Sequence, residues 1–379
     1  MRVLFVSHSF PPEAETLEAN LGGMQRVATE LYASLIETRA VHVHPLVLRT
    51  TWSRTHLRTP GFLLRAYRGI RRLVRDQAVD VVLFSSMVTA TLAVPLRGFL
   101  HKHGVPTAAI VHGRDVTLDT WLHQRVVVPK TFRAVDAVMP VSQATGAQCL
   151  ERGLPPDKLH VVPNGIDLHR FDPERVQGLS ALPTRAPGAF VLCSVGRQVK
   201  RKGFAWFVEH VLPRLPDAVE YWLAGDGPEH DAIRDAAAQH GVAERVRLLG
   251  RISEADLARL YWEADLFVMP NIPVPGDMEG FGVVMLEAGL CGVPVVAARL
   301  EGIQDVITEG QNGHLVESGD APGFTAAIRP YHEDAAALQA LSERAAQHVI
   351  ATFSWQAVAQ RYVSALLTLV RQTHVPQRA

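Results

Sequence analysis

Short apolar segments alternate with amphipathic stretches along the whole chain. Strands that are buried on both faces of a parallel sheet appear in sequence as nearly continuous apolar runs, so these segments predict parallel strands. The predicted strands are residues 2–7, 41–48, 79–85, 107–111, 137–141, 190–195, 220–224, 246–249, 266–269 and 294–297. Helical periodicity fills the intervals, as in residues 24–36 and 65–76, and residues 353–369 are typical of a long final helix. We therefore expect an α/β protein.

The strand–helix alternation occurs twice, on either side of a proline-rich stretch at residues 171–188. Proline and glycine interrupt regular structure, so this stretch is the expected linker. We predict Rossmann-like domains at residues 1–170 and 189–352, and a length of 379 residues agrees with two domains.

Composition narrows the class of protein. With 47% hydrophobic and 20% charged residues, the chain is typical of a globular protein. Cys149, Cys193 and Cys291 form no CxxC pair, which favours reduced thiols in the cytoplasm over a disulfide framework. No apolar run reaches the ~18 residues of a membrane span, and the N-terminal run is too short for a signal peptide. We expect a cytoplasmic protein, soluble or peripheral on the inner face of the plasma membrane, with no nucleic-acid partner.

The net charge of zero conceals a difference between the two halves. Residues 1–187 hold 22 Lys and Arg against 15 Asp and Glu, a net charge of +7, and residues 188–379 balance this with −7. No acidic residue occurs from Thr38 to Arg75, and residues 49–75 contain eight arginines. Such an asymmetry is expected of two domains that bind different partners.

The basic stretch at residues 49–75 permits two interpretations. Its helical part places one apolar and one basic face on opposite sides. The apolar face holds Leu63, Tyr67, Ile70 and Val74, the basic face holds Arg65, Arg68, Arg72 and Arg75, and Trp52, Phe62 and Leu64 flank them. The stretch either binds an anionic membrane surface or packs its apolar face on the sheet and leaves the arginines in solvent. The sequence leaves both open.

Ligand-binding residues should follow the strands, because ligands of open parallel sheets bind beyond the carboxyl ends of the strands. Gly22 and Gly23 precede a predicted helix, where bare glycines let backbone N–H groups approach an anion. By itself this pair is more typical of a tight turn, and the lack of a GxGxxG pattern disfavours an NAD site. His112 directly follows a predicted strand and precedes Gly113, a placement that favours a site histidine.

A basic turn follows the predicted strand at residues 190–195. Gly196 and Arg197 directly follow that strand, and Lys202 and Gly203 precede the next helix. Arginine and lysine at a strand-to-helix turn can clamp a diphosphate without a metal ion. A merely solvated turn is the alternative, which we disfavour because these charges lie in the acidic half of the chain.

The strongest local signal is the segment at residues 279–287. Gly280 and Gly282 open a helix, so the first backbone N–H groups of that helix are free to point at an anion. These N–H groups belong to Phe281, Gly282 and Val283. The segment therefore predicts a second anion-binding element.

Two carboxylates flank this helix start. Glu279 lies before the helix and Glu287 lies inside it, and carboxylates suit the hydroxyl pairs of ribose and hexose. Because the helix is apolar on nearly all sides, Glu287 should have a partner and not simply be exposed. Asp277 and Glu279 are similar to a DxD metal pair, but we expect the Arg–Lys clamp in place of a metal ion.

Together these motifs resemble the retaining glycosyltransferases of family 4, which have the GT-B fold. The resemblance covers nearly the whole length. It rests on Gly22-Gly23, His112-Gly113-x-Asp115, Val162-Pro163-Asn164-Gly165-Ile166-Asp167, Gly196-Arg197 with Lys202-Gly203, Ala224-Gly225-Asp226-Gly227-Pro228, Glu279-x7-Glu287 and Asn312-Gly313-His314-Leu315-Val316. It implies two facing domains with an interdomain cleft, the acceptor on the N-terminal side and the donor on the C-terminal side. It also implies that a final helix at about 353–375 crosses back onto the N-terminal domain.

The resemblance further implies roles for single residues. Arg197 and Lys202 hold the donor diphosphate, and Glu287 binds the ribose. Glu279 and the backbone after it hold the transferred sugar, which His112 contacts near the reacting centre. The other implied donor-site residues are Gly22, Gly23, Asp115, Asn164, Gly196, Asp226, Arg251, Phe281, Gly282 and Val283. In one departure, many members have Gly-Gly before a Pro-Glu pair where this chain has Glu301-Gly302-Ile303-Gln304-Asp305.

The implied activity is that of a metal-independent, retaining hexosyltransferase without a cofactor, with a UDP-sugar favoured over a GDP-sugar as the donor. The implied acceptor is a glycan or a lipid-linked molecule of lipopolysaccharide or glycolipid assembly. Three alternatives remain: glycosylation of a small soluble acceptor such as an antibiotic or thiol precursor, a nucleotide-sugar epimerase or phosphorylase on the same fold, and a non-catalytic sugar-binding protein.

Overall fold

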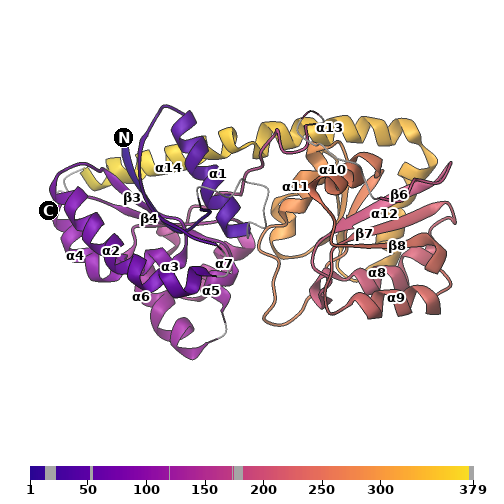
Figure 1. The fold of residues 1–379 in the computed structure, drawn as a ribbon, viewed down its shortest axis with the longest axis horizontal. Coiled ribbons are helices and arrows are strands. Elements are labelled where there is room, and N and C mark those ends of the chain that lie inside the picture. The colour runs from indigo at the N-terminus through magenta and orange to yellow at the C-terminus, as the bar shows by residue number, and fades with distance from the viewer. Residues whose placement is uncertain (13–22, 52–53, 119, 173, 175–181, 375–379) are drawn as a thin grey trace. The chain divides into compact units, whose positions relative to one another are not determined.

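The computed structural model describes residues 1–12, 23–51, 54–118, 120–172, 174 and 182–374 (Figure 1). The chain divides into two compact units. Unit 1 consists of Met1–Gly165 together with Trp355–Ala379, and unit 2 consists of Ile166–Ser354. Gly22, Trp52 and residues 173 and 175–181 of the expected linker lie outside the described residues.

Unit 1 is built on a parallel sheet, which has five strands among the described residues, in the order β2-β1-β3-β4-β5. The strands are β1 Arg2–Phe10, β2 His42–Arg49, β3 Val81–Phe84, β4 Thr107–Val111 and β5 Ala137–Pro140. Every residue of β3, β4 and β5 is buried, which explains why these strands appear in sequence as unbroken apolar runs.

Helices surround this sheet. They are α1 Gly23–Glu37, α2 Thr55–Arg75, α3 Met87–Ala90, α4 Ala93–Lys102, α5 Arg114–Thr117, α6 Val128–Ala134 and α7 Gln143–Glu151, with short turns η2 His123–Val127 and η3 Pro156–Lys158. The last helix, α14 Trp355–His374, belongs to this unit and packs against α1. The prediction of a final helix from residue 353 is wrong at its start, because Phe353 ends the preceding helix and Ser354 separates the two.

The apolar face of α2 packs into the core of unit 1. Ile70 and Val74 are buried, and Leu63 and Tyr67 pack against the same cluster. Phe62, which the sequence placed at the edge of a membrane-facing surface, is also buried and is 2% exposed. Helical periodicity alone does not distinguish these two environments. Of the surface expected to meet a membrane, Leu64 is 54% exposed, and the exposed basic side chains are Arg49, Arg54, Arg58, Arg65, Arg68, Arg72 and Arg75.

Unit 2 contains a second parallel sheet, with six strands among the described residues, in the order β11-β10-β9-β6-β7-β8. The strands are β6 Phe190–Val195, β7 Val219–Ala224, β8 Val246–Gly250, β9 Leu266–Met269, β10 Val295–Arg299 and β11 Gly313–Glu317. The sequence pattern did not predict β11. This edge strand contains a glycine, a histidine and a glutamate, so it lacks the continuous apolar run of a central strand.

The helical segments of unit 2 are η4 Lys200–Lys202, α8 Phe204–His210, η5 Leu212–Arg214, α9 His230–Gln239, η6 Ala243–Arg245, α10 Glu254–Glu263, α11 Val283–Leu290, η7 Glu301–Asp305, α12 Ala321–Glu333 and α13 Ala335–Phe353. Side-chain caps fix several helix starts. Ser253 accepts a hydrogen bond from the Asp256 N–H at α10, and Asp334 accepts from Ala336 and Ala337 at α13. Such caps satisfy backbone donors that have no partner within the helix.

Candidate active site

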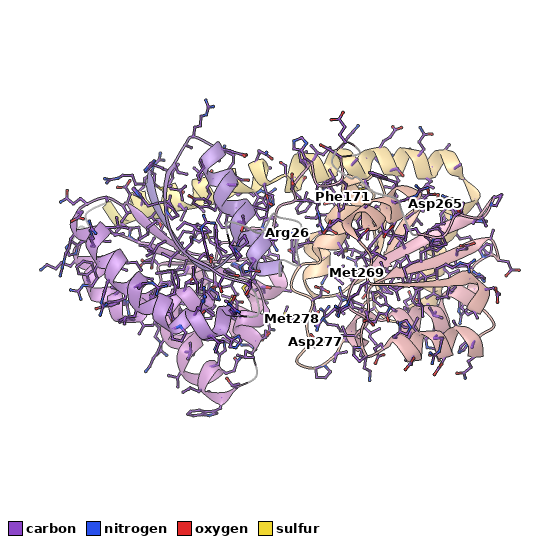
Figure 2. The ribbon with its side chains drawn as sticks, in the orientation of Figure 1. Arg26, Phe171, Asp265, Met269, Asp277 and Met278 are labelled. Atoms are coloured by element: carbon purple, nitrogen blue, oxygen red, sulfur yellow. The ribbon has the colours of Figure 1, made fainter. Side chains whose placement is uncertain are left out.

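The loops after β6, β9 and β10 converge in unit 2, because these three strands are neighbours in a parallel sheet. Met269 ends β9, and Asp277 and Met278 lie in the loop that follows it (Figure 2). The carboxyl edge of a parallel sheet is where ligands of such folds bind. The basic turn and the segment at residues 279–287 therefore meet at one edge, in agreement with the family resemblance, which implied that both bind the donor.

Glu279 is the centre of a buried ion-pair cluster. Its carboxylate accepts a hydrogen bond from Lys202 Nζ at 2.6 Å and a second from the guanidinium of Arg201. The side chains of Lys202 and Glu279 are only 8% and 12% exposed. Burial alone would raise the pKa of Glu279, but Lys202 and Arg201 outweigh burial and hold this pKa at about 2. Glu279 is therefore a weakly basic, permanently ionised carboxylate.

Arg201 is a member of this cluster that sequence reasoning missed. Its Nε lies 3.1 Å from Asp277 Oδ1, so both carboxylates of the DxD-like segment bind one arginine. The only available signal was the run of three basic residues, which does not say which of them points inward. The structure brings Asp277 and Glu279 together around a guanidinium.

Arg197 is placed differently from Lys202. It is exposed at the end of β6, and no carboxylate of the described residues lies within ion-pair distance of it. The backbone beside it is closely packed, because a Cβ atom on Gly225 would lie 1.9 Å from the Gly196 carbonyl oxygen. Glycine is therefore required where the loops after β6 and β7 touch, which gives the Gly196 and Gly225 motifs a physical basis.

Glu287 is buried and partnered, as predicted. It is 5% exposed, the Tyr261 hydroxyl donates a hydrogen bond to Oε2 at 2.9 Å, and Arg170 forms an ion pair with Oε1. Arg170 also contacts Glu254 at 3.1 Å. Burial raises the pKa of Tyr261 well above its usual value, and the neighbouring Glu287 adds to this shift. The hydroxyl therefore keeps its proton and donates the hydrogen bond. The sequence predicted that a partner exists but did not identify Arg170 or Tyr261.

The start of α11 presents free backbone donors. Gly282 precedes the helix with φ of 87°, a conformation that favours glycine. Among the described residues, the N–H groups of Phe281, Gly282 and Val283 make none of the observed hydrogen bonds. They lie in the chain between the two partnered carboxylates, so an anion could meet N–H groups here and cations at Lys202 and Arg197.

In unit 1, His112 is held at the end of β4. Its Nε2 lies 2.9 Å from the Ser85 carbonyl oxygen, and because a carbonyl only accepts, Nε2 carries a proton and donates it. In a neutral ring Nδ1 is then an acceptor. Asp115 accepts the His112 N–H at 3.0 Å and the Met87 N–H at 3.3 Å. Burial raises the pKa of Asp115, and His112 and these N–H groups oppose the rise. Asp115 thus ties together the loops after β3 and β4.

His8 is a second histidine of this region that the sequence did not single out. It is 6% exposed, and its Nδ1 lies 3.3 Å from Ser86 Oγ. Burial, with a smaller contribution from His112, lowers its pKa to about 4, so it is a neutral hydrogen-bonding group near pH 7. Its position near the end of β1, next to β3 in the sheet, was the signal that could have found it.

The remaining predicted residues occupy varied positions. Gly23 begins α1. Asn164 is 7% exposed, and its Oδ1 is buried without a hydrogen-bond partner among the described residues. Asp226 and Arg251 form an exposed ion pair at 3.8 Å after β7 and β8. Such exposed pairs contribute little to stability, which leaves both side chains able to bind other groups.

Comparison with known proteins identifies the family. A model described as Glycosyltransferase Family 4 matches residues 21–170, and a model described as Glycosyl transferases group 1 matches residues 189–334. The chain belongs to the family 4, group 1 glycosyltransferases. Membership of this family, which the sequence motifs implied, is thereby confirmed.

Several curated relatives are similar to this glycosyltransferase. WcaL of Salmonella typhimurium, named for colanic acid biosynthesis, is 29% identical over 69% of this chain and 64% of its own length. The lipopolysaccharide core biosynthesis glycosyltransferase LpsE of Rhizobium meliloti is 38% identical over 48% of this chain and 51% of its own length. The chain therefore spans less than two thirds of the length of each of these two relatives. A GDP-mannose-dependent phosphatidylinositol monomannoside mannosyltransferase of Corynebacterium glutamicum is 27% identical, over 96% of this chain and 97% of its own.

Solved structures show the same fold. HepE of Anabaena in complex with UDP superposes with a TM-score of 0.71 at 20% identity, covering 97% of this chain and 100% of that one. Sucrose-phosphate synthase of Thermosynechococcus elongatus gives a TM-score of 0.69 at 20% identity, with 98% and 99% covered. This glycosyltransferase has the GT-B fold, with a Rossmann-like parallel sheet in each unit.

Proposed function

We propose that this glycosyltransferase moves a hexose from a nucleoside diphosphate sugar to an acceptor hydroxyl with retention of configuration and without a metal ion or cofactor. The observation that carries the proposal is the buried cluster of Lys202, Arg201 and Glu279 beside the free N–H groups at the start of α11. A cationic side chain and a helix N-terminus at one sheet edge match the two anionic phosphates of the donor.

The diphosphate is the part of the donor that gains charge during the reaction. As the sugar departs, negative charge grows on the leaving diphosphate, and Lys202, Arg197 and the α11 N–H groups would stabilise it. Preorganised electrostatic stabilisation of this kind is usually the largest catalytic contribution. Because these side chains supply the positive charge, the reaction needs no divalent cation in this role.

The protonation state of Glu279 supports a binding role for this carboxylate. Effective general bases have a pKa near the working pH, whereas Lys202 and Arg201 hold the pKa of Glu279 at about 2. Glu279 is therefore suited to accept hydrogen bonds from sugar hydroxyls and poorly suited to remove a proton. We propose that a phosphate oxygen of the leaving group takes the acceptor's proton on the same face of the sugar, a route that retains configuration.

Glu287 completes the donor site proposed in unit 2, and a separate role is proposed for His112 of unit 1. Glu287, fixed by Arg170 and Tyr261, accepts the ribose hydroxyls of the nucleotide. His112 contacts the transferred sugar, with Nε2 committed to Ser85 and Nδ1 available as an acceptor. The donor nucleotide is proposed to be UDP, in line with the similar fold of the HepE structures that contain UDP and UDP-glucose. The relatives named as GDP-mannose-dependent make GDP the alternative donor nucleotide.

The acceptor is proposed to be a glycan or a lipid-linked molecule that unit 1 binds. Relatives named for colanic acid, lipopolysaccharide core and phosphatidylinositol mannoside assembly support this class. No helix of the described residues is long and apolar enough to cross a membrane. We propose that the exposed arginines of residues 49–75 meet an anionic membrane surface or an anionic acceptor, since basic side chains near such a surface each contribute about 1 kcal/mol.

A panel of UDP-, GDP- and ADP-sugars tests the proposal. The assay measures nucleoside diphosphate release with and without candidate acceptors, including lipid-linked glycans and small soluble alcohols and thiols. A transferase releases nucleoside diphosphate with an acceptor, and chromatography of the donor would instead reveal an epimerised nucleotide sugar. Calorimetric binding without release from any donor would favour a non-catalytic sugar-binding protein and contradict the proposal.

A further inference from the structure

Glu301 has an unfavourable backbone conformation beside the candidate active site. It begins η7 with φ of 49°, in the left-handed region that residues with a Cβ atom rarely adopt. Among the described residues, Arg39 and Gln77 are the other non-glycine positions with positive φ. Both of these follow the C-terminal end of a helix, where such a conformation is common. Glu301 instead follows β10, at the edge where the ligand loops meet.

Residues 301 and 302 hold both backbone groups of Glu279. The Glu301 carboxylate accepts the N–H of Glu279, and the N–H of Gly302 donates to the Glu279 carbonyl oxygen at 3.1 Å. The two segments touch closely, because a Cβ atom on Gly302 would lie 2.1 Å from the Gly280 carbonyl oxygen. The backbone of Glu279 is thus fixed from one side while Lys202 and Arg201 fix its carboxylate from the other.

Glu301 also adds a third carboxylate to this site. Glu279 and Asp277 face it from the loop after β9, and Arg201 faces it from η4. Burial raises the pKa of Glu301, and the nearby charge of Glu279 raises it further, whereas the Glu279 N–H and Arg201 lower it. The positive φ of Glu301 and the like charge of Glu279 both make this conformation of Glu301 less stable. The hydrogen bond from the Glu279 N–H is the favourable interaction that this conformation makes possible.

We propose that Glu301 is a positioning residue whose ionised carboxylate fixes the backbone of Glu279 and thereby aims the Glu279 carboxylate at the donor sugar. This inference rests on the proposed function, because it assigns Glu301 to the sugar part of the same donor site. It predicts an effect on sugar recognition that is separate from nucleotide binding, since Glu287 and its partners lie outside the hydrogen bonds made by Glu301.

Two substitutions separate the carboxylate from the backbone conformation. Glu301→Gly permits the positive φ but removes the acceptor of the Glu279 N–H. Glu301→Gln keeps an oxygen that accepts this N–H but removes the charge. Gln77→Gly is the matched control, because it relieves a φ of 50° at a residue of unit 1 that follows α2. Calorimetry gives the affinity of each protein for UDP and for the UDP-sugar that it turns over, and the ratio of these affinities reports sugar recognition.

Glu301→Gly should lower this ratio about tenfold, as expected for loss of a charge-assisted hydrogen bond. UDP affinity should not change, and the unfolding temperature should stay the same or rise because glycine accepts the positive φ. Glu301→Gln should lower the ratio less than Glu301→Gly, because an amide oxygen still accepts the Glu279 N–H but makes a weaker hydrogen bond than a carboxylate. Gln77→Gly should leave the ratio unchanged. Equal ratios in Glu301→Gly and the unchanged protein would overturn the inference, as would a parallel loss of UDP affinity and stability.

The pH profile of transfer adds a readout that a purely structural role would not change. The ionised carboxylate makes the stronger hydrogen bond, and the pKa of Glu301 is raised, so kcat/KM should fall with decreasing pH in a range above that of an ordinary glutamate. Glu279 stays ionised there because its pKa is about 2. Glu301→Gln should lack this acidic limb, and an unchanged limb would contradict the inference. If no nucleoside diphosphate sugar is bound or turned over by the unchanged protein, the proposed function itself fails.

Discussion

Lys202 and Glu279 are 77 residues apart in sequence, yet the Lys202 ammonium lies 2.6 Å from the Glu279 carboxylate in the interior of unit 2. Breaking one side of a buried pair leaves an uncompensated charge, which typically costs about 3–5 kcal/mol. Lys202 therefore has a structural partner as well as the diphosphate that we assign to it. Both anions draw on the same ammonium group, so substitution at either residue should alter stability and catalysis together.

The first prediction concerns stability and pH. Glu279 has a pKa of about 2 in the folded protein against an ordinary value of 4.5, so its stabilisation is present above pH 4.5 and is lost as the pH falls towards 2. This shift corresponds to stabilisation on the order of 3 kcal/mol. Glu279→Gln should unfold at lower urea concentration than the unchanged protein at pH 7, and the difference should shrink with decreasing pH. A difference that is constant from pH 7 to pH 3 would contradict the cluster's electrostatics.

The second prediction separates the two carboxylates. Glu287→Gln should weaken UDP binding, and Glu279→Gln should leave UDP affinity nearly intact while transfer falls. Each lost charged hydrogen bond should cost about 1.5–3 kcal/mol, or about 10- to 150-fold in the dissociation constant. Calorimetry with UDP and single-turnover transfer measure the two effects.

Tyr261→Phe is the matched control for this division of roles. It removes the hydroxyl that donates to Glu287 but keeps the ring and the Arg170 pair. UDP binding should weaken less in Tyr261→Phe than in Glu287→Gln, because the ribose acceptor remains. Equal loss of UDP affinity in the Glu279 and Glu287 variants would refute separate sites for the sugar and the ribose.

The third prediction concerns the exposed arginines of α2. Anionic vesicles should carry the protein into the pellet at low salt. This binding should weaken steeply with added salt and should be absent with neutral vesicles. The triple change Arg58→Glu, Arg65→Glu and Arg68→Glu should abolish binding. The control reverses three exposed arginines of unit 2, Arg234, Arg259 and Arg329, and so makes the same change in net charge. Protein that stays in the supernatant with anionic vesicles at low salt would favour a small soluble acceptor.

The sequence predicted most of the fold, because its information is local. Each predicted strand corresponds to an observed strand within a few residues, since central parallel strands must be apolar on both faces. Edge strand β11 has no such requirement and was not predicted. The sequence predicted the apolar face of α2. Whether this face packs on the core or meets a membrane depends on the tertiary structure.

The candidate site was predicted in part, for the same physical reason. Glycines and charged residues at strand ends located the site, and the apolar helix around Glu287 showed that this carboxylate needed a partner. The partner itself, Arg170, lies 117 residues away in sequence. Arg201, His8 and Glu301 were missed as interacting groups because their roles come from burial and from contacts between loops after different strands.

The central claim is that cationic side chains and the α11 N–H groups, with no metal ion, stabilise the leaving diphosphate during retaining transfer. Proton NMR of the glycoside formed in the presence of excess EDTA tests it most directly, because the anomeric coupling constant reports configuration while the chelator removes divalent ions. The account predicts undiminished product formation with the same anomeric configuration as the donor sugar. A product of inverted configuration, or transfer that stops in EDTA and returns with Mg²⁺ or Mn²⁺, would contradict it.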